Sequence, residues 1–562
     1  MRCSNPKLLL LSHFIAIAAL GQDIGSLAKE QPFRIQGTLS AGLTYYSASG
    51  IESRREPFSW YLSGAPVITI YGISFPFTLT VSEQERRFAQ PFNRYGVSPT
   101  YKWIKLHAGY RNVKFSDFTL SGITMLGGGV ELNPGKLRFG FMMGRINRAI
   151  PEGTVTPGGT LNPMYKRTGY SIKVGIGTQN NYFDLIFFKG RDDSASIPKP
   201  SLTSRIVPLD NAVLGAKTHF RFFKVLTFDA DLAVSALTRD LYSRRFDDTS
   251  DAKLVTLNKY SSILKLNAST GLFTAARTSL TYGFKAGNIA ARYERVDQDF
   301  QTLGAYFFAN DNEQWTLAPT FSLFKNKVSV SAAYGKARDN LNGQKYATTL
   351  RTIGSFDLGL QLSPKLFVGL NLSNFGTNQR KGIGELYTDD IAISMVNNSY
   401  GLSSNYTDLD EHKMQSVYFS SGYQDAIDRN IYTRDLTNVK SLFANLGYTY
   451  TLMEKQTSVT LAAMYNQNRM PTQTSTVIGP SASFSTTVFN KSLRPTLSGV
   501  YYLRNTDGQS DGHTFSGSAS LGYTIGRQTI SLSINYLRNK TLISTIPEFT
   551  ELRSTLTYGY RF

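Results

Sequence analysis

The sequence has almost no cysteine. Its single cysteine, Cys3, lies at the start of the chain, before an apolar run from Leu8 to Leu20. A chain with one cysteine forms no internal disulfide, and a lone thiol cannot build a thiolate metal site. Because Cys3 precedes the apolar run, it also does not occupy the position of a lipid-modified cysteine.

Long hydrophobic runs are also missing. Beyond the N-terminus, no stretch approaches about 18 uninterrupted apolar residues, so the sequence predicts no membrane-spanning helix. The N-terminal run is shorter, follows two basic residues and ends with the small residues Ala19 and Gly21. This pattern is typical of a secretory signal peptide. We therefore expect residues 1–21 to be a signal peptide and residues 22–32 a short periplasmic N-terminus.

Catalytic patterns are scarce. The chain has five histidines, and it contains no GxSxG, HExxH or phosphate-loop motif. His412 and His513 lie in predicted loops beside acidic residues, which is a common arrangement. The glycine run 127–129 lies inside a strand pattern, which favours close packing or a bend over phosphate binding. We therefore predict that the protein is not an enzyme and binds no cofactor.

Aromatic residues and glycine are abundant. They include 32 Tyr, 36 Phe and 47 Gly, and the mean hydropathy is slightly negative. This composition in an exported chain suits an outer-membrane barrel, whose alternating strands hide an apolar exterior in a polar average. The formal net charge is +20. An exported protein is not expected to bind nucleic acid, so lipid phosphates or anions in a pore are the expected partners.

The C-terminus alternates with a period of two. Leu552, Leu556, Tyr558, Tyr560 and Phe562 are apolar, and the residues between them are polar or small. This is the pattern of a strand with one apolar and one polar face. We expect the even-numbered face to contact lipid. The terminal aromatic pattern of Tyr558, Tyr560 and Phe562 resembles the signal that barrel-assembly machinery recognises.

The same alternation recurs along the chain and predicts 22 strands. They lie near residues 33–47, 67–81, 101–111, 124–132, 137–145, 168–177, 182–190, 211–222, 226–237, 278–285, 289–297, 315–324, 328–337, 353–363, 365–374, 441–451, 457–467, 480–489, 493–503, 515–525, 529–538 and 550–562. Tight turns alternate with long connections, of which 375–440 is the longest, as in outer-membrane barrels with long extracellular loops.

The predicted fold is therefore all-β. We expect residues 33–562 to form a transmembrane antiparallel up-and-down β-barrel of about 22 strands, within a range of roughly 20–24. The first strand begins about a dozen residues after the predicted cleavage site, so we expect no N-terminal plug domain. The lumen of a barrel this wide is either occupied by a plug or forms a channel that conducts solutes. The connection 375–440 is the best internal candidate for folding inward.

The segment 82–100 departs from the alternation of connections, since it is long but falls on the predicted periplasmic side. It carries basic and aromatic side chains, namely Arg86, Arg87, Phe92, Arg94 and Tyr95. One hypothesis is that it docks a periplasmic or lipoprotein partner, or folds into the barrel mouth. The alternative is a tucked turn that seals the wall.

Charged residues of the predicted lumen face fall opposite one another on neighbouring strands. The hairpin at 133–136 sets Glu131 against Arg138, and the turn near 223–225 sets Lys217 against Asp231 and His219 against Asp229. These predicted pairs are best interpreted as structural, with a metal or catalytic role for His219 as the lesser alternative. Elsewhere the predicted lumen face is small and polar, for example at Ser331, Asn371, Ser518 and Ser533.

Several stretches resemble a group of outer-membrane β-barrel proteins from Bacteroidota. They are QPFNRYGVSPTYKWIKLHAGYR, FSDFTLSG and GGGVELNPGKLRFGFMMGR, and YERVDQDFQTLGAYFFANDNEQWTL from Tyr293. Together they cover about a fifth of the chain. The resemblance implies an outer-membrane barrel, and it brings no activity, substrate or site residues.

Two functional hypotheses follow. The first is a porin-like or transport-type pore for small solutes in the outer membrane of a Gram-negative cell. The second is a non-enzymatic barrel subunit of a secretion, gliding or envelope-biogenesis complex. The expected partners are outer-membrane lipid and lipopolysaccharide, the barrel-assembly machinery during biogenesis, and a periplasmic or lipoprotein partner for the second hypothesis.

Overall fold

The computed structural model describes residues 31–83, 94–156, 159–201, 204–244, 264–306, 309–383, 388, 391–542 and 547–562. The predicted signal peptide and three of the predicted docking residues, Arg86, Arg87 and Phe92, lie outside these ranges. Within these ranges, no helix has the length and apolar character to cross a membrane.

The described chain is built almost entirely of β-strands. The strands are β1 (Arg34–Gln36), β2 (Thr38–Ser49), β3 (Phe58–Gly64), β4 (Val67–Ile70), β5 (Ile73–Ser82), β6 (Arg94–Val97), β7 (Thr100–Tyr101), β8 (Ile104–Asn112), β9 (Thr124–Leu132), β10 (Leu137–Asn147), β11 (Val155–Thr156), β12 (Gly159–Thr160), β13 (Arg167–Gly177), β14 (Tyr182–Asp192), β15 (Asp210–Phe222), β16 (Leu226–Thr238), β17 (Thr270–Phe284), β18 (Gly287–Val296), β19 (Asn312–Leu323), β20 (Val328–Arg338), β21 (Ala347–Ser363), β22 (Leu366–Lys381), β23 (Ser394–Leu409), β24 (Lys413–Asp428), β25 (Val439–Leu452), β26 (Thr457–Arg469), β27 (Thr474–Ser485), β28 (Leu493–Thr506), β29 (Gln509–Ile525), β30 (Gln528–Thr541) and β31 (Phe549–Arg561). A short helix, α3, spans Arg434–Thr437.

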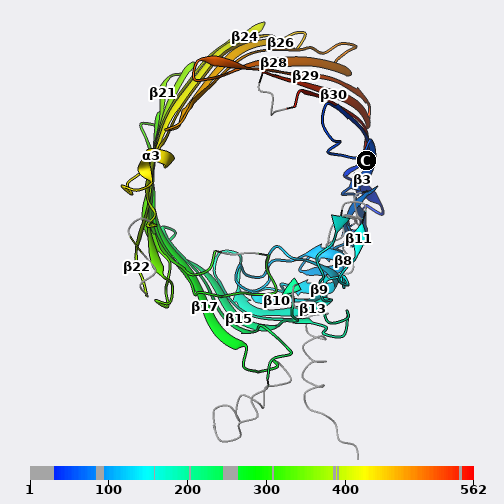
Figure 1. Cartoon of the computed structure of the whole chain (residues 1–562). Coiled ribbons are helices and arrows are strands. Elements are labelled where there is room, and N and C mark those ends of the chain that lie inside the picture. Colours follow the sequence, from blue (N-terminus) through cyan, green and yellow to red (C-terminus); the bar gives the residue numbers. More distant parts are fainter. Residues whose placement is uncertain are drawn as a thin grey trace, which may run out of the picture.

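The strands form one closed antiparallel barrel (Figure 1). Each strand pairs with its sequence neighbours, and the last strand β31 closes the wall against β2, from Thr38↔Arg561 to Ser49↔Thr550. Three strands are interrupted, so that β1 and β2, β3 and β4, and β6 and β7 are halves of single strands. With each of these counted once, and with the small hairpin β11–β12 set aside, the barrel has 26 strands.

The interruptions have local causes. Gly37 separates β1 from β2 with φ +118°, a left-handed conformation that favours glycine. Pro66 follows β3 and Pro99 follows β6, and a proline cannot donate a hydrogen bond to the ladder. As a result β6 pairs with β8 at Gly96↔Gly109 and Val97↔Ala108, and β7 takes over the pairing at Thr100↔Lys105.

The predicted number of strands is wrong, because 26 strands are present and 22 were expected. The range 67–81 holds two strands joined by Tyr71-Gly72, whose positive φ angles of 46° and 78° are those of a two-residue hairpin turn. The broken strand β6–β7 adds one more. The expected long loop 375–440 contains β23 and β24, so this loop does not exist as predicted. Strand β23 was missed because half of its residues are Asn, Ser or Thr, and β24 because Gln415, Ser421 and Asp425 interrupt the apolar row of Val417, Phe419 and Tyr423.

Connections differ at the two ends of the barrel. At one end lie tight turns such as 71–72, 102–103 and 526–527, together with the described chain ends near Arg34 and Phe562. The other end carries the long connections, including 148–166 and 239–269. The strands flanking 83–93 meet at this second end, at Ser82 and Arg94. The prediction that segment 82–100 shares the side of the tight turns is therefore wrong.

Candidate functional site

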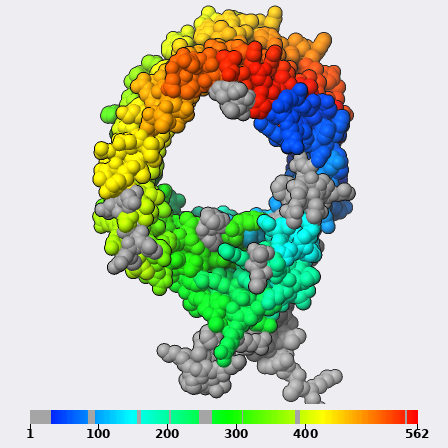
Figure 2. All heavy atoms as spheres, viewed as in Figure 1, coloured from blue at the N-terminus to red at the C-terminus, as the bar shows by residue number. Residues whose placement is uncertain are grey.

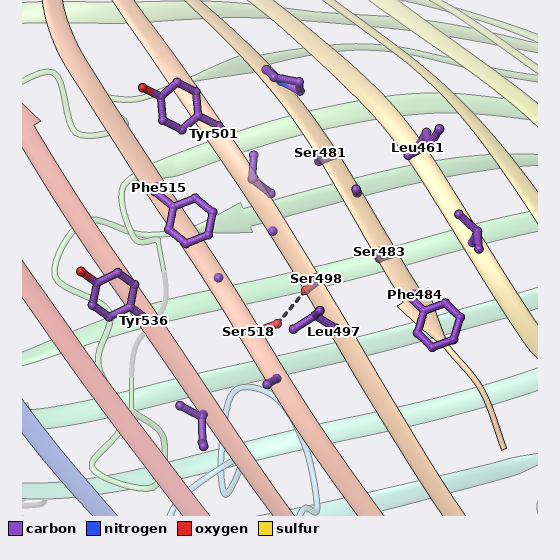
Figure 3. Close-up of a pocket in the computed structure, with 18 residues that line it drawn as sticks. Leu461, Ser481, Ser483, Phe484, Leu497, Ser498, Tyr501, Phe515, Ser518 and Tyr536 are labelled. Atoms are coloured by element: carbon purple, nitrogen blue, oxygen red, sulfur yellow. Dashed lines mark hydrogen bonds between the residues drawn. The ribbon is translucent and has the colours of Figure 1, made fainter. Parts of the chain in front are cut away.

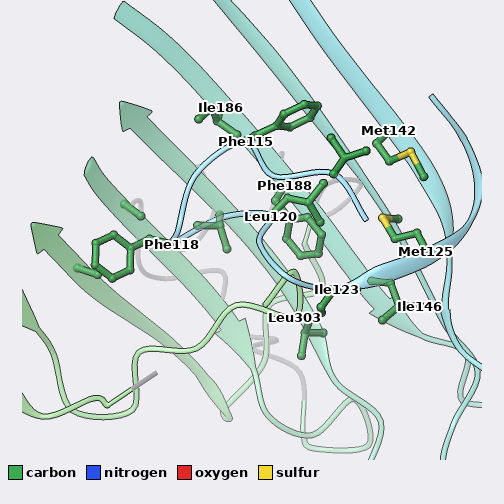
Figure 4. Close-up of a cluster of buried hydrophobic side chains, with 14 of the residues drawn as sticks. Phe115, Phe118, Leu120, Ile123, Met125, Met142, Ile146, Ile186, Phe188 and Leu303 are labelled. Atoms are coloured by element: carbon green, nitrogen blue, oxygen red, sulfur yellow. The ribbon is translucent and has the colours of Figure 1, made fainter. Parts of the chain in front are cut away.

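The lumen contains a first inner loop, residues 113–123, which we call inner loop A. It leaves β8, turns into the barrel and runs along the inner face of the wall (Figure 4). Its apolar side chains are buried, with exposed fractions of 3% for Phe115, 1% for Phe118 and 0% for Leu120. They pack on wall residues such as Met142 and Ile186. Burying one such side chain stabilises the docked loop by about 1.5–3 kcal/mol.

A second inner loop, residues 297–306, lies between β18 and β19 and is called inner loop B. It packs directly on inner loop A. The amide of Ser121 donates to the carbonyl of Gly304 at 2.9 Å, and the hydroxyl of Thr302 donates to the carbonyl of Thr119 at 2.9 Å. The rings of Phe118 and Phe300 meet edge to face, with centroids 5.8 Å apart. The two loops therefore form one packed unit inside the barrel.

Polar wall residues hold inner loop B. The amide of Leu303 donates to Oδ1 of Asn211 at 2.9 Å, and the hydroxyl of Ser235 donates to the carbonyl of Gln301 at 2.6 Å. Asn211 in turn donates to the Ser235 hydroxyl at 2.8 Å. Asn211 and Ser235 are fully buried. Buried polar groups need such partners, so both side chains fix the position of the loop.

Asp231 on β16 holds inner loop A. Its carboxylate accepts the hydroxyl of Ser116 at 2.6 Å and the amide of Asp117 at 3.0 Å. Asp117 also accepts a bond from Arg277 at 3.0 Å, and the Arg277 guanidinium lies 5.2 Å from the ring centre of Phe118. The loop is thus fixed by a buried carboxylate and by a cation stacked on its central aromatic ring.

The structure places the predicted charge pairs of β15 and β16 as neighbours. Lys217 and Asp231 are Cα partners, but the Asp231 carboxylate bonds inner loop A. His219 and Asp229 are Cα partners too, and Nδ1 of His219 lies 2.6 Å from Oδ1 of Asp229. In the part of the chain that the structure describes, no group of three or more His, Cys, Asp or Glu side chains could hold a metal ion.

The predicted contact of Glu131 with Arg138 is wrong. The Cα partner of Glu131 is Gly140, and Arg138 instead makes two bonds to Asp184, at 2.7 and 2.9 Å. The side chain of Arg138 reaches Asp184 across β13 at Gly175, where an added Cβ would lie 2.0 Å from Oδ1 of Asp184. Because Gly175 has no side chain, the Arg138 guanidinium can extend over β13 and contact Asp184 on β14.

Glu131 forms a cluster that sequence reasoning missed. It lies 3.0 Å from Nε2 of His107 and 3.4 Å from Nζ of Lys105, and Nδ1 of His107 lies 2.9 Å from the hydroxyl of Ser98. The residue types match a Ser–His–acid relay. Ser98 is 1% exposed, however, so its hydroxyl does not face the lumen water. The cluster bridges the broken strand β6–β7 to β8 and β9.

The two halves of the lumen differ in character. From β8 to β18 the lumen face is rich in charged side chains, including Lys173, Lys217 and the pair Arg277–Glu294. From β22 to β30 it carries mainly Ser, Thr, Asn and Gly, as in the hydrogen-bonded pairs Ser498–Ser518 and Thr449–Thr460. The inner loops cover the charged half, and the neutral half faces the hollow that Figure 2 shows.

The outward face of the wall is apolar. Residues that are Cα partners on neighbouring strands point to the same side of the wall. The inward side, which is known where the inner loops pack, can therefore be assigned strand by strand as far as β31. There Leu556 and Tyr558 point outward and are 44% and 42% exposed, while Glu551 points inward and bonds Tyr46 at 2.5 Å. Phe562 ends the chain with its ring against Tyr560, centroids 5.1 Å apart.

Figure 3 shows the same outward side on β26 to β30, where aromatic and aliphatic side chains surround a shallow groove of about 860 Å³. Leu461, Phe484, Leu497 and Phe515 are all well exposed there. Exposing so large an apolar surface to water is unfavourable, so this face is expected to contact an apolar environment. A closed barrel with an apolar exterior and tight turns at one end is a transmembrane barrel of the outer-membrane type.

Comparison with known proteins gives low similarity. No family model matches the chain, and no curated protein matches it. Among solved structures, an iron transporter (FrpB) from Neisseria meningitidis is 10% identical with a TM-score of 0.40, covering 93% of this chain and 81% of that one. A ferric preacinetobactin receptor (BauA) from Acinetobacter baumannii is 10% identical with a TM-score of 0.37, covering 94% and 81%. The P pilus usher (PapC) translocation pore is 9% identical with a TM-score of 0.26, covering 94% and 99%. Scores this low carry no argument about function.

Proposed function

We propose that this protein is a pore-type barrel of the outer membrane, which passes polar solutes through the neutral half of its lumen. The observation that carries this proposal is the two-sided lumen. Inner loops A and B cover the charged half, while small neutral side chains such as Ser498, Ser518 and Asn535 line the other. Small polar groups leave room for water and hold no fixed charge.

The tight turns would face the periplasm and the long connections the outside. In this orientation both inner loops enter from the outside, as constriction loops do. They reduce the width of the passage without closing it in the part of the chain that the structure describes. The terminal aromatic residues Tyr558, Tyr560 and Phe562 would serve as the assembly signal at the periplasmic end.

Single-channel recording in planar bilayers tests the proposal. The purified mature protein should give stable conductance steps. A variant with inner loop A shortened by replacing 115–121 with Gly-Ser should give larger steps, because the loop occupies cross-section. A barrel that inserts, shows heat-modifiable migration on gels and never conducts would refute the proposal.

The width of the barrel favours a second candidate function. Twenty-six strands about 4.8 Å apart and tilted by about 40° give a wall on the order of 50 Å across. Such a lumen can also hold another protein, which suits a subunit of an outer-membrane assembly. Purification in mild detergent followed by mass spectrometry separates the two, because a stoichiometric partner supports the assembly and a lone conducting species supports the pore.

A further inference from the structure

A pocket on the outward face of β20 to β24 carries positive charge, and the described residues that line it include no Asp or Glu. It has a volume of about 420 Å³ and lies near the end of the long connections. Its outward-facing cations are Lys336 on β20, Arg380 on β22 and Arg429 after β24, whereas Arg351 on β21, which also borders the pocket, belongs to the inward-facing row of its strand. All three side chains are exposed, and within the described residues none of them forms an ion pair.

The pocket floor is small and polar. Lys336, Thr352, Gly376 and Val396 follow one another as Cα partners across four strands, so they share one face. Gly376 leaves the floor open, because an added Cβ would find its nearest neighbour, Cβ of Thr352, at 3.8 Å. Asn378, one row nearer the long connections, adds amide donors.

Within the described residues, two neighbouring cations on the same face do have acidic neighbours. The next cation on β20, Arg338, bonds Glu313 at 2.5 Å. Asp425 lies beyond the pocket on β24 and has Lys440 as a Cα partner on β25. Three cations around one concavity, with no ion pair to any described residue, repel each other unless an anion joins them, so the pocket is complementary to a negatively charged group.

An apolar surface lies directly beneath the pocket on the same strands. One polar row separates them, in which Asn374 bonds Asn398 at 2.6 Å. The next rows present Phe356, Leu372 and Tyr400 and then Leu370 and Leu402, each more than a third exposed. Thr352 and Phe356 are four residues apart, or about 13 Å along the strand. This distance matches the step from a lipid headgroup to its acyl chains.

We infer that β20 to β24 form a binding site for a phosphate-bearing lipid of the outer leaflet. The phosphate lies between Lys336, Arg380 and Arg429, and acyl chains cover Phe356, Leu372 and Tyr400. Guanidinium groups suit phosphate because they bind it with two parallel hydrogen bonds. The inference rests on the proposed location in the outer membrane, but it does not need the lumen to conduct.

Native mass spectrometry of the full mature chain in detergent tests the site. The probes are phosphorylated lipid A, the same lipid without phosphate, and inorganic phosphate. The wild type should retain the phosphorylated lipid. The triple variant K336Q/R380Q/R429Q should bind it about 100-fold more weakly, since each cation near a lipid surface contributes a several-fold factor. Gly376→Leu should also weaken binding, because it fills the floor and leaves all charges in place.

The matched control removes three charges from tight turns at the other end, in the variant K224Q/K325Q/K327Q, and should bind as the wild type does. Equal binding by the wild type and the triple variant would overturn the inference. So would equal retention of the dephosphorylated lipid, which indicates contact through acyl chains alone. Binding of inorganic phosphate that displaces the lipid would identify a free-anion site and would also overturn it. Conductance recorded on the same preparations tests the pore separately.

Discussion

Replacing Asp231 with alanine should release inner loop A from the barrel wall. The Asp231 carboxylate is 6% exposed and accepts two bonds from the loop, from the Ser116 hydroxyl and the Asp117 amide. Bonds to a charged group contribute about 1.5–3 kcal/mol each. Part of this is offset because the variant no longer buries a carboxylate. A net loss of about 2–4 kcal/mol in docking free energy follows.

Amide hydrogen exchange measures this loss directly. The amide of Ser121 is bonded to inner loop B and is protected while the loops are docked. A loss of about 2–4 kcal/mol corresponds to exchange roughly 30- to 900-fold faster. Asp231→Asn keeps one acceptor oxygen and should give an intermediate rate. The control is Asp229→Ala, on the same strand and face, because Asp229 bonds His219 and not the loop. Equal protection of Ser121 in the Asp231→Ala and Asp229→Ala variants would refute this account of the loop.

Three further predictions follow from the same contacts. Phe118→Ala should cost about 3–5 kcal/mol of docking free energy, because a fully buried ring is removed. Protease should then cleave the variant within 113–123 under conditions in which the wild type stays folded and uncut. Resistance to protease equal to that of the wild type would contradict this prediction. Burial alone would raise the pKa of Asp117, but the Lys114 hydrogen bond and the charges of Lys217 and Arg277 outweigh it, so the pKa is lowered. A lowered pKa gives stability that is present above the usual value near about 4 and is lost as the pH falls below it. The protection factor of the Ser121 amide, which is its intrinsic exchange rate at each pH divided by the observed rate, should therefore be steady from pH 7 to about 5 and fall below about 4, whereas Asp117→Asn should remove this fall. Gly175→Ala should destabilise the barrel by about 1–3 kcal/mol through its clash with Asp184, seen as a lower temperature of heat modification on gels, while Gly354→Ala, where the nearest atom is 3.6 Å away, should change little.

The sequence predicted the barrel because alternation is a direct consequence of a wall between lipid and water. Strands such as β16 and β31 keep large apolar side chains on the outward face, so their period of two is plain. Strand β23 could not be read in this way, since Asn398 and Ser404 interrupt the outward row of Tyr400, Leu402 and Tyr406. Tyr71-Gly72 was missed because a two-residue turn interrupts the alternation so briefly.

The inner loops were not predicted, although their residues stood out. The stretches FSDFTLSG and DQDFQTLG supported the resemblance, and both lie in the inner loops. A physical signal was present, because Phe115, Phe118 and Leu120 place apolar side chains without a period of two in a connection between strands. The contact of Arg138 with Asp184 was beyond prediction, because it spans two strands and depends on the small size of Gly175.

The broken strands set the mechanical character of the wall. The seam between β31 and β2 is continuous over twelve paired positions. Between β5 and β8, by contrast, the halves β6 and β7 share the pairing over short stretches on either side of Pro99. Under a lateral force on the barrel, neighbouring strands should therefore separate at β6 and β7 before they separate at the pairing of β2 with β31. The contacts of His107 with Ser98 and Glu131 would have to break before the strands separate at this point.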